Sequence, residues 1–132
     1  MKDPFANYVI QYILDLKLPE VSAIVGEQLL GLLLVLSKEK FSSNVIEKCL
    51  ESTSPDIRSR MVDEVMQATN FKDYLADQYG NYVIQKAIQV ATESKRTRFL
   101  ELLKPDMAQL AHAGNLGYKI YCRLAKQYPM LQ

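Results

Sequence analysis

Polar side chains recur in pairs, four residues apart, at three places in the sequence. The pairs are Asn7 with Gln11, Ser43 with Glu47, and Asn81 with Gln85. On an α-helix, residues i and i+4 lie one above the other on the same face. Amide, hydroxyl and carboxylate groups placed in this way could together form hydrogen bonds to the edge of a flat polar ligand.

Each pair belongs to a five-residue segment that occurs four times. NYVIQ at 7–11 returns unchanged at 81–85, and diverged copies stand at 43–47 (SNVIE) and 117–121 (GYKIY). The copies start 36, 38 and 36 positions apart, and a fixed period of this length is typical of a helical solenoid. Two positions before the first three copies stands an aromatic residue, whereas Asn115 takes this place before the fourth. The aromatic residues are Phe5, Phe41 and Tyr79.

The third and fourth residues of the copies are apolar, with Lys119 as the exception. They are Val9/Ile10, Val45/Ile46, Val83/Ile84 and Lys119/Ile120. A helix with this pattern buries one face and presents its first, second and fifth motif residues on another. We expect four such motif helices, at about 5–16, from 42 or 43 to near 52, from just after Gly80 to about 90, and at 114–127. Two further helical segments in each period, and no strand-like alternation, predict an all-α fold.

Composition and charge limit the other classes. The chain has 132 residues, enough for one domain, and its net charge of +1 provides no overall basic field to attract a polyanion. Cys49 and Cys122 are far apart in sequence, and we expect them to be reduced thiols of an intracellular protein with structural roles. The apolar run 29–36 is too short to span a bilayer, and we expect it to form a core helix.

Three stretches of the sequence resemble consecutive repeats of a Pumilio/PUF RNA-binding domain: FANYVIQ, FSSNVIEKC and DQYGNYVIQK. The resemblance covers essentially the whole chain and is strongest to the sixth, seventh and eighth repeats and the closing pseudo-repeat of that family. It implies a right-handed α-solenoid of three-helix repeats, similar to armadillo arrays. We expect a single domain over 1–132 that is a fragment of a longer one. Its approximate repeats are 1–29 (partial), 30–68, 69–103 and 104–132, the last a degenerate cap.

The resemblance also implies that each repeat reads one base of single-stranded RNA. Asn81/Gln85, Ser43/Glu47 and Asn7/Gln11 would then read 5′-UGU in that order, since the RNA runs antiparallel to the repeats in this family. The chemistry agrees, because amides suit the uracil edge and a carboxylate suits the N1–H and N2–H donors of guanine. The second motif residues are expected to stack on the bases: Tyr8, Asn44, Tyr82 and Tyr118. Gly117 and Tyr121 predict no edge reading by the fourth copy.

Proteins of this family repress or destabilise messenger RNAs through 3′-untranslated regions. The resemblance therefore implies a cytoplasmic protein whose partners are RNA with a UGU core and deadenylase or translational-repressor proteins, without a cofactor, a small-molecule substrate or a membrane. Segment 69–74 corresponds to a partner-binding loop in some relatives, although the spacing of Phe71 and Tyr74 favours packing in the core. As a fragment, the chain alone is expected to bind RNA weakly.

Other interpretations remain open from the residues alone. A protein-binding solenoid of the armadillo or HEAT type would share the period, although exact repetition of polar residues favours a ligand. Lys48 and Lys86 follow the fifth motif residues and could contact phosphates or simply be solvated. His112 is the only histidine, and neither a metal-ligand spacing nor a phosphate-binding glycine loop occurs. We expect a protein that is not an enzyme.

Overall fold

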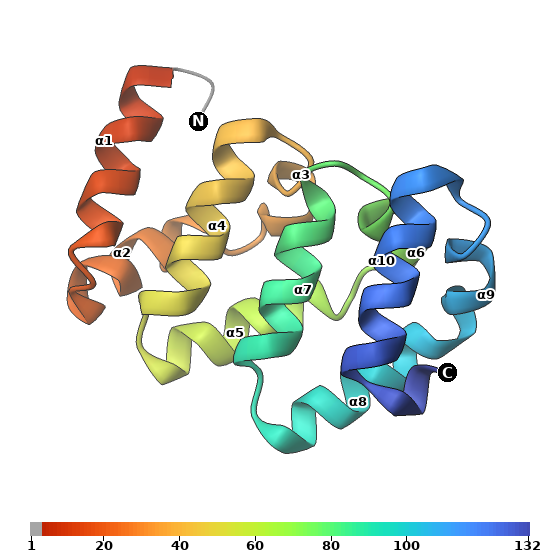
Figure 1. The fold of residues 1–132 in the computed structure, drawn as a ribbon. Helices are drawn as coiled ribbons and strands as arrows, with labels where there is room; N and C mark the ends of the chain where they lie inside the picture. The colour runs from red at the N-terminus through yellow and green to blue at the C-terminus, as the bar shows by residue number, and fades with distance from the viewer. Residues whose placement is uncertain (1–3) are drawn as a thin grey trace.

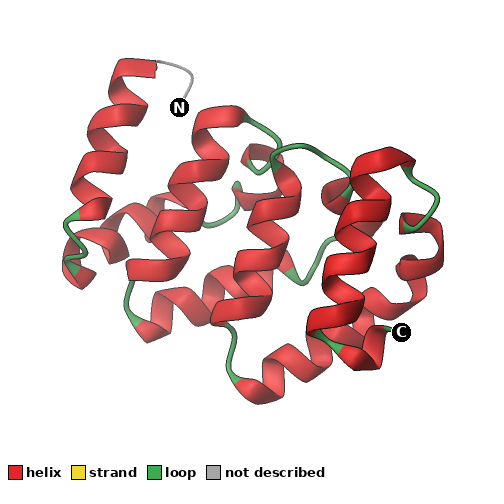
Figure 2. Cartoon of the chain, viewed as in Figure 1, coloured by secondary structure: helices red, strands yellow, loops and turns green. Residues whose placement is uncertain are grey.

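The computed structural model describes the backbone of residues 4–132 and the side chains of residues 8–132, and this part of the chain is built from helices and loops without a strand (Figure 2). The helices are α1 (Pro4–Asp15), α2 (Pro19–Leu29), α3 (Leu33–Leu36), α4 (Lys40–Ser52), α5 (Pro55–Val65), α6 (Phe71–Leu75), α7 (Gly80–Val90), α8 (Glu93–Leu103), η1 (Lys104–Asp106), α9 (Met107–Leu110), α10 (Gly114–Gln127) and η2 (Pro129–Leu131). The all-α fold predicted from the sequence is confirmed.

The motif helices α1, α4, α7 and α10 form one layer of the molecule. In Figure 1 they stand roughly parallel in chain order, and α4 packs against both α1 and α7. Helices α2, α5 and α8 form a second layer, in which α2 packs on α4 and α5, and α5 packs on α7. The short helices α3, α6 and α9 complete the units: α3 packs on α5, and α6 packs on α7 and α9. Each period therefore contributes one motif helix to the same face of the stack.

Helix starts follow local sequence signals and contacts between neighbouring repeats. Pro19 and Pro55 open α2 and α5, where the proline ring has a helical φ and its missing N–H costs no hydrogen bond. The Glu64 carboxylate accepts hydrogen bonds from the backbone N–H groups of Gly31 and of Leu33, the latter at 2.9 Å, at the start of α3. Asp106 accepts the N–H of Phe71 at 3.0 Å at the start of α6. Glu64 thus caps the short helix of its own repeat, and Asp106 caps the short helix of the repeat before its own.

The core runs between the two layers and includes the apolar motif residues of α4 and α7. Val45, Ile46, Val83 and Ile84 are fully buried, as is Phe71, in agreement with its predicted packing role. Tyr74 is half-buried beneath the ammonium group of Lys38, which lies 4.6 Å from the ring centroid. The buried pairs fix the rotation of each motif helix, and so determine which residues it presents outward.

The apolar run 29–36 does not form one core helix, and that prediction was wrong. Helix α2 ends at Leu29, Gly31 adopts a φ of 90°, and α3 begins at Leu33. A positive φ is accessible to glycine and interrupts the helix there. Leu29 and Leu33 are buried, whereas Val35 is 73% exposed. Among residues 4–132, no helix has both the length and the apolar character that crossing a membrane requires.

Candidate nucleic-acid interface

The second motif residues are exposed in all four copies. Tyr8, Tyr82 and Tyr118 are 61%, 49% and 58% exposed, and Asn44 is also at the surface. Tyr8 meets the ring of Phe41 edge-on, with centroids 5.6 Å apart, whereas the Asn44 side chain donates a hydrogen bond to the Lys40 carbonyl at 3.1 Å. Flat tyrosine rings on this surface are suited to stack on flat ligands, and Asn44 offers a smaller platform.

The first motif residues are buried where their side chains are described. Ser43 is 3% exposed and its hydroxyl donates to the Lys40 carbonyl at 3.0 Å. Asn81 is 1% exposed and its Nδ2 donates to the Asp77 carbonyl at 2.7 Å. Asn7 lies in α1, but its side chain is outside the described residues, as is that of Phe5. The first residue thus supports the start of its helix in addition to its predicted contact with a base edge.

The fifth motif residues are half-buried and remain within reach of a ligand. Gln11, Glu47 and Gln85 come from α1, α4 and α7, which pack in succession. Gln85 Nε2 donates to Asn81 Oδ1 at 3.0 Å. Among the contacts of the described residues, this leaves Gln85 with one N–H and its carbonyl oxygen for a ligand. An amide fixed in this orientation offers the donor and acceptor pair that complements the uracil edge.

Glu47 is the one acidic member of this row, and its surroundings affect its charge. Burial raises the pKa of Glu47, and the charge of Lys86 opposes this most strongly. Glu51 raises the pKa further and Lys48 lowers it. An ionised carboxylate only accepts hydrogen bonds, so it would pair with a ligand edge that carries donors.

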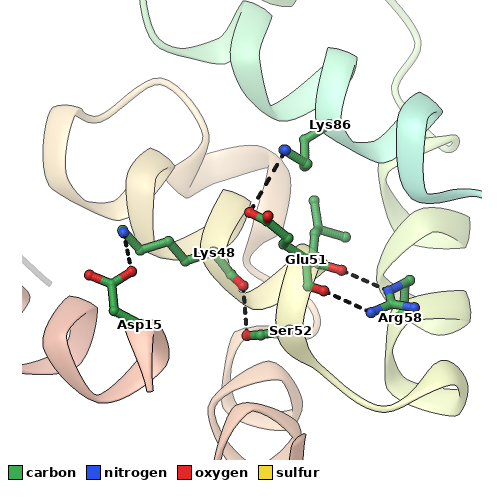
Figure 3. Close-up of polar contacts among 7 residues, drawn as sticks. Asp15, Lys48, Glu51, Ser52, Arg58 and Lys86 are labelled. Atoms are coloured by element: carbon green, nitrogen blue, oxygen red, sulfur yellow. Dashed lines mark hydrogen bonds and ion pairs between the residues drawn. The ribbon is translucent and has the colours of Figure 1, made fainter. Parts of the chain in front are cut away.

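Lys48 and Lys86 form ion pairs with the preceding motif helix. Lys48 of α4 bonds to Asp15 of α1, and Lys86 of α7 lies with Nζ 3.8 Å from Glu51 Oε2 of α4 (Figure 3). Both pairs use the same positions in successive copies. The lysine directly follows the fifth motif residue of its own copy, and the acid stands four residues after the fifth motif residue of the preceding copy. These pairs tie successive helices together beside the row of fifth residues, and their role toward phosphates stays a prediction.

The fourth copy lacks a reading pair, and the structure gives a packing reason. A Cβ on Gly117 would lie 2.7 Å from both the Ala113 Cβ and the Leu110 carbonyl oxygen, so the close approach of the preceding turn requires glycine. Tyr121 is half-buried and lies against Tyr118, with ring centroids 6.5 Å apart and an interplanar angle of 22°. A hydrogen bond with Cys122, which is exposed, raises the pKa of Tyr118.

Two kinds of recurring contact were not predicted from the sequence. The acids Asp15 and Glu51, which pair with Lys48 and Lys86, stand 36 positions apart like the motif copies. Arg58 and Arg96, which are 38 positions apart, bind the carbonyl groups that end α4 and α7. In both cases the period was the available signal.

Within the part of the chain that the structure describes, no three His, Cys, Asp or Glu side chains gather as metal ligands would.

Known proteins share both the sequence pattern and the fold. The Pumilio-family RNA-binding repeat (PUF) matches residues 1–27, 33–66 and 76–103. A Pumilio domain-containing protein of Schizosaccharomyces pombe is 33% identical over 129 residues, 98% of this chain and 19% of that protein. Pumilio homolog 12 of Arabidopsis thaliana is 36% identical over 126 residues, 96% of this chain and 21% of that protein. The chain therefore spans about a fifth of the length of these relatives.

Two solved structures are similar over nearly the whole chain. The crystal structure of PUF-8 in complex with PBE-RNA has a TM-score of 0.80 and 28% identity, covering 98% of this chain and 38% of the PUF-8 chain. The Puf3 RNA-binding domain bound to a recognition sequence of the Cox17 RNA 3′ UTR has a TM-score of 0.76 and 29% identity, covering 94% of this chain and 34% of that one. The repeat match, the relatives and the shared solenoid together show that this chain belongs to the Pumilio (PUF) family.

Proposed function

We propose that this chain binds single-stranded RNA and that α7, α4 and α1 read the bases of 5′-UGU in that order. The observation that carries the proposal is the row of half-buried Gln11, Glu47 and Gln85 beside exposed second residues on one layer of helices. Each step along the stack offers one polar group for a base edge. Tyr8 and Tyr82 offer rings that can stack on the flat face of a base. This is the arrangement that one-base-per-repeat recognition requires.

The base assignments rest on hydrogen-bonding groups. Gln85, held by Asn81, offers a donor and an acceptor to uracil. Gln11 provides the same amide group two repeats earlier, on the other side of Glu47. Glu47 as a carboxylate accepts the N1–H and N2–H of guanine and repels the carbonyl oxygens of uracil. Lys48 and Lys86 are candidate phosphate contacts, and a phosphate there would be a second anionic partner beside Asp15 and Glu51.

The cellular role that we propose is regulation of messenger RNA. The similar Puf3 domain is bound to a 3′ UTR recognition sequence, which supports 3′-untranslated regions as the targets. Repression or decay of the bound transcript in the cytoplasm, through deadenylase or translational-repressor proteins, would follow from the family resemblance. With three bases read, the chain alone should bind weakly, because association costs several kcal/mol before contacts contribute.

The experiment is fluorescence anisotropy at fixed salt with a short UGU-containing RNA and with RNAs whose middle base is adenine or uracil. We expect the guanine RNA to bind most tightly, and equal binding of all three would contradict base reading. Ser43→Asn combined with Glu47→Gln should move the preference at the middle base from guanine to uracil. A good bidentate contact to a DNA base discriminates by about 1–3 kcal/mol, and we expect a similar change here. An unchanged preference would refute the assignment of these two residues.

A further inference from the structure

An acidic side chain of α4 pairs with a cation from the next repeat, and a second acid stands one helical turn before it in α4. Glu47 and Glu51 are four residues apart and therefore share a face of the helix. Lys86, which directly follows Gln85 in α7, extends toward Glu51, with its Nζ 3.8 Å from Glu51 Oε2 (Figure 3). The Lys86 side chain is about one-fifth exposed, at 21%, so water screens its charge only in part.

The charged groups that act on Glu47 are few and can be ranked. Burial is the largest influence and raises the pKa of Glu47, Lys86 is the strongest opposing influence, Glu51 adds to the rise, and Lys48 has the weakest effect. Lys48 is bound to Asp15 on the other side of α4. Burial outweighs each charged group, and among the charged groups Lys86 and Glu51, which form an ion pair with each other, act on the pKa of Glu47 more strongly than Lys48 does.

We propose that Lys86 is a positioning residue for guanine recognition, whose ammonium group, held beside Glu51 on the face of α4 that also carries Glu47, keeps Glu47 a carboxylate when a base covers it. This inference rests on the proposed reading of guanine by Glu47. A carboxylate accepts both donors of the guanine edge, whereas a protonated acid can also donate to the ring N1 of adenine. Loss of the cation should therefore weaken discrimination between guanine and adenine at the middle base and leave the flanking uracils unaffected.

The decisive test breaks the same ion pair from its two ends. Lys86→Met should lower the ratio of affinities for UGU over UAU by about two- to fivefold, the range expected for a partly exposed ion pair. Glu51→Gln removes the competing anion and should raise that ratio or leave it unchanged. If the pair only holds α4 and α7 together, both variants would lower the ratio alike, and that outcome would overturn the inference.

A second measurement uses no RNA. The carboxyl carbon of Glu47, followed by NMR during a pH titration, should show a higher pKa in Lys86→Met and a lower one in Glu51→Gln than in the unmodified chain. The same direction in both variants, or no change in Lys86→Met, would refute the electrostatic link. If the pKa values move as expected but the unmodified chain does not prefer UGU over UAU, the guanine assignment is wrong and this inference is overturned with it.

Controls separate this role from a phosphate contact. A Lys86 bound to phosphate would, on mutation, weaken binding to UGU and UAU equally and reduce the salt dependence of affinity. Lys86→Arg preserves the charge and should retain the base preference. Lys48→Met removes the matched lysine of the neighbouring ion pair, and it should change the UGU to UAU ratio less than Lys86→Met does. A larger change in Lys48→Met would contradict the role of Lys86.

Discussion

Removing the Arg58 side chain should destabilise the stack more than any exposed charge change on the same helix. Arg58 stands in α5, and its guanidinium reaches back to the end of α4 (Figure 3). Nε donates to the Leu50 carbonyl at 2.7 Å, and Nη2 donates to the carbonyls of Glu51 and Thr53 at 2.9 and 3.1 Å. The last carbonyls of a helix have no partner within the helix, so one planar fork satisfies two of them together with the carbonyl of Thr53, the residue that follows α4.

The loss of stability expected in Arg58→Ala depends on how far water can hydrogen-bond to each carbonyl once the guanidinium is gone. The bond to the Glu51 carbonyl is exposed, whereas those to Leu50 and Thr53 are partly buried. A hydrogen bond with a charged partner contributes about 1.5–3 kcal/mol, and the two partly buried bonds should account for most of the effect. We expect Arg58→Ala to lower the free energy of unfolding by about 2–4 kcal/mol, a large share of the roughly 5–15 kcal/mol typical of a domain.

The assay is equilibrium denaturation in urea. Where the variants and the unmodified chain share the same dependence of unfolding free energy on urea concentration, the shift in midpoint reports the change in stability. Arg60→Ala is the matched control in the same helix, because Arg60 only approaches Glu27 at 4.0 Å with both side chains more than half exposed. It should cost less than about 0.5 kcal/mol. Arg58→Lys should recover little, since an ammonium group cannot span three carbonyls as the fork does. A loss in Arg58→Ala no larger than in Arg60→Ala would refute the capping argument.

Three further outcomes follow from single contacts. Gly117→Ala should destabilise by about 1–3 kcal/mol in the same urea assay, because its Cβ would overlap the preceding turn; an effect as small as that of Lys119→Ala, an exposed site in α10, would contradict this. Burial raises the pKa of Cys49 to about 12, so at mildly alkaline pH a thiol reagent should modify the exposed Cys122 and spare Cys49 until the chain unfolds; two equally fast thiols would be the contrary result. Asn81→Ala frees the Gln85 amide and should reduce the preference for uracil at the first base alone. Anisotropy with RNAs in which that base is replaced would measure this, and an equal change of preference at the middle base would contradict the role of Asn81.

Much of the fold could be predicted because apolar and proline positions fix it locally. The buried pairs Val45/Ile46 and Val83/Ile84 repeat with the period, and Pro19 and Pro55 stand at the first positions of α2 and α5. The prediction of one helix over 29–36 failed because hydrophobicity does not reveal where a helix is interrupted. There, Gly31 and the capping carboxylate of Glu64, which is distant in sequence, decide the geometry.

The candidate site was predictable in its residue types but only partly in its environment. Helical spacing is enough to place residues one, two and five of each copy together. It does not tell that Asn81 is buried against the Asp77 carbonyl, nor that Cys122, predicted to be structural, is exposed. The partners of Lys48 and Lys86 lie on another helix, so their ion pairs depend on how neighbouring helices pack rather than on the motif itself.

The ion pairs also explain why base choice and stability need not be independent in this fold. In α4 and α7 the third and fourth motif residues are buried in the core, so changing the fifth residue should leave the packing intact. The residue after it is not so free, because Lys86 both joins α7 to α4 and acts on the charge of Glu47. On the proposed role of Lys86, a carboxylate at the fifth position should depend on a cation from the next repeat, whereas Gln11, being neutral, does not depend on its neighbour's Lys48 for its charge state. A glutamate at the fifth motif position of a repeat whose next repeat lacks the lysine equivalent to Lys86 should discriminate guanine less than Glu47 does in the native chain.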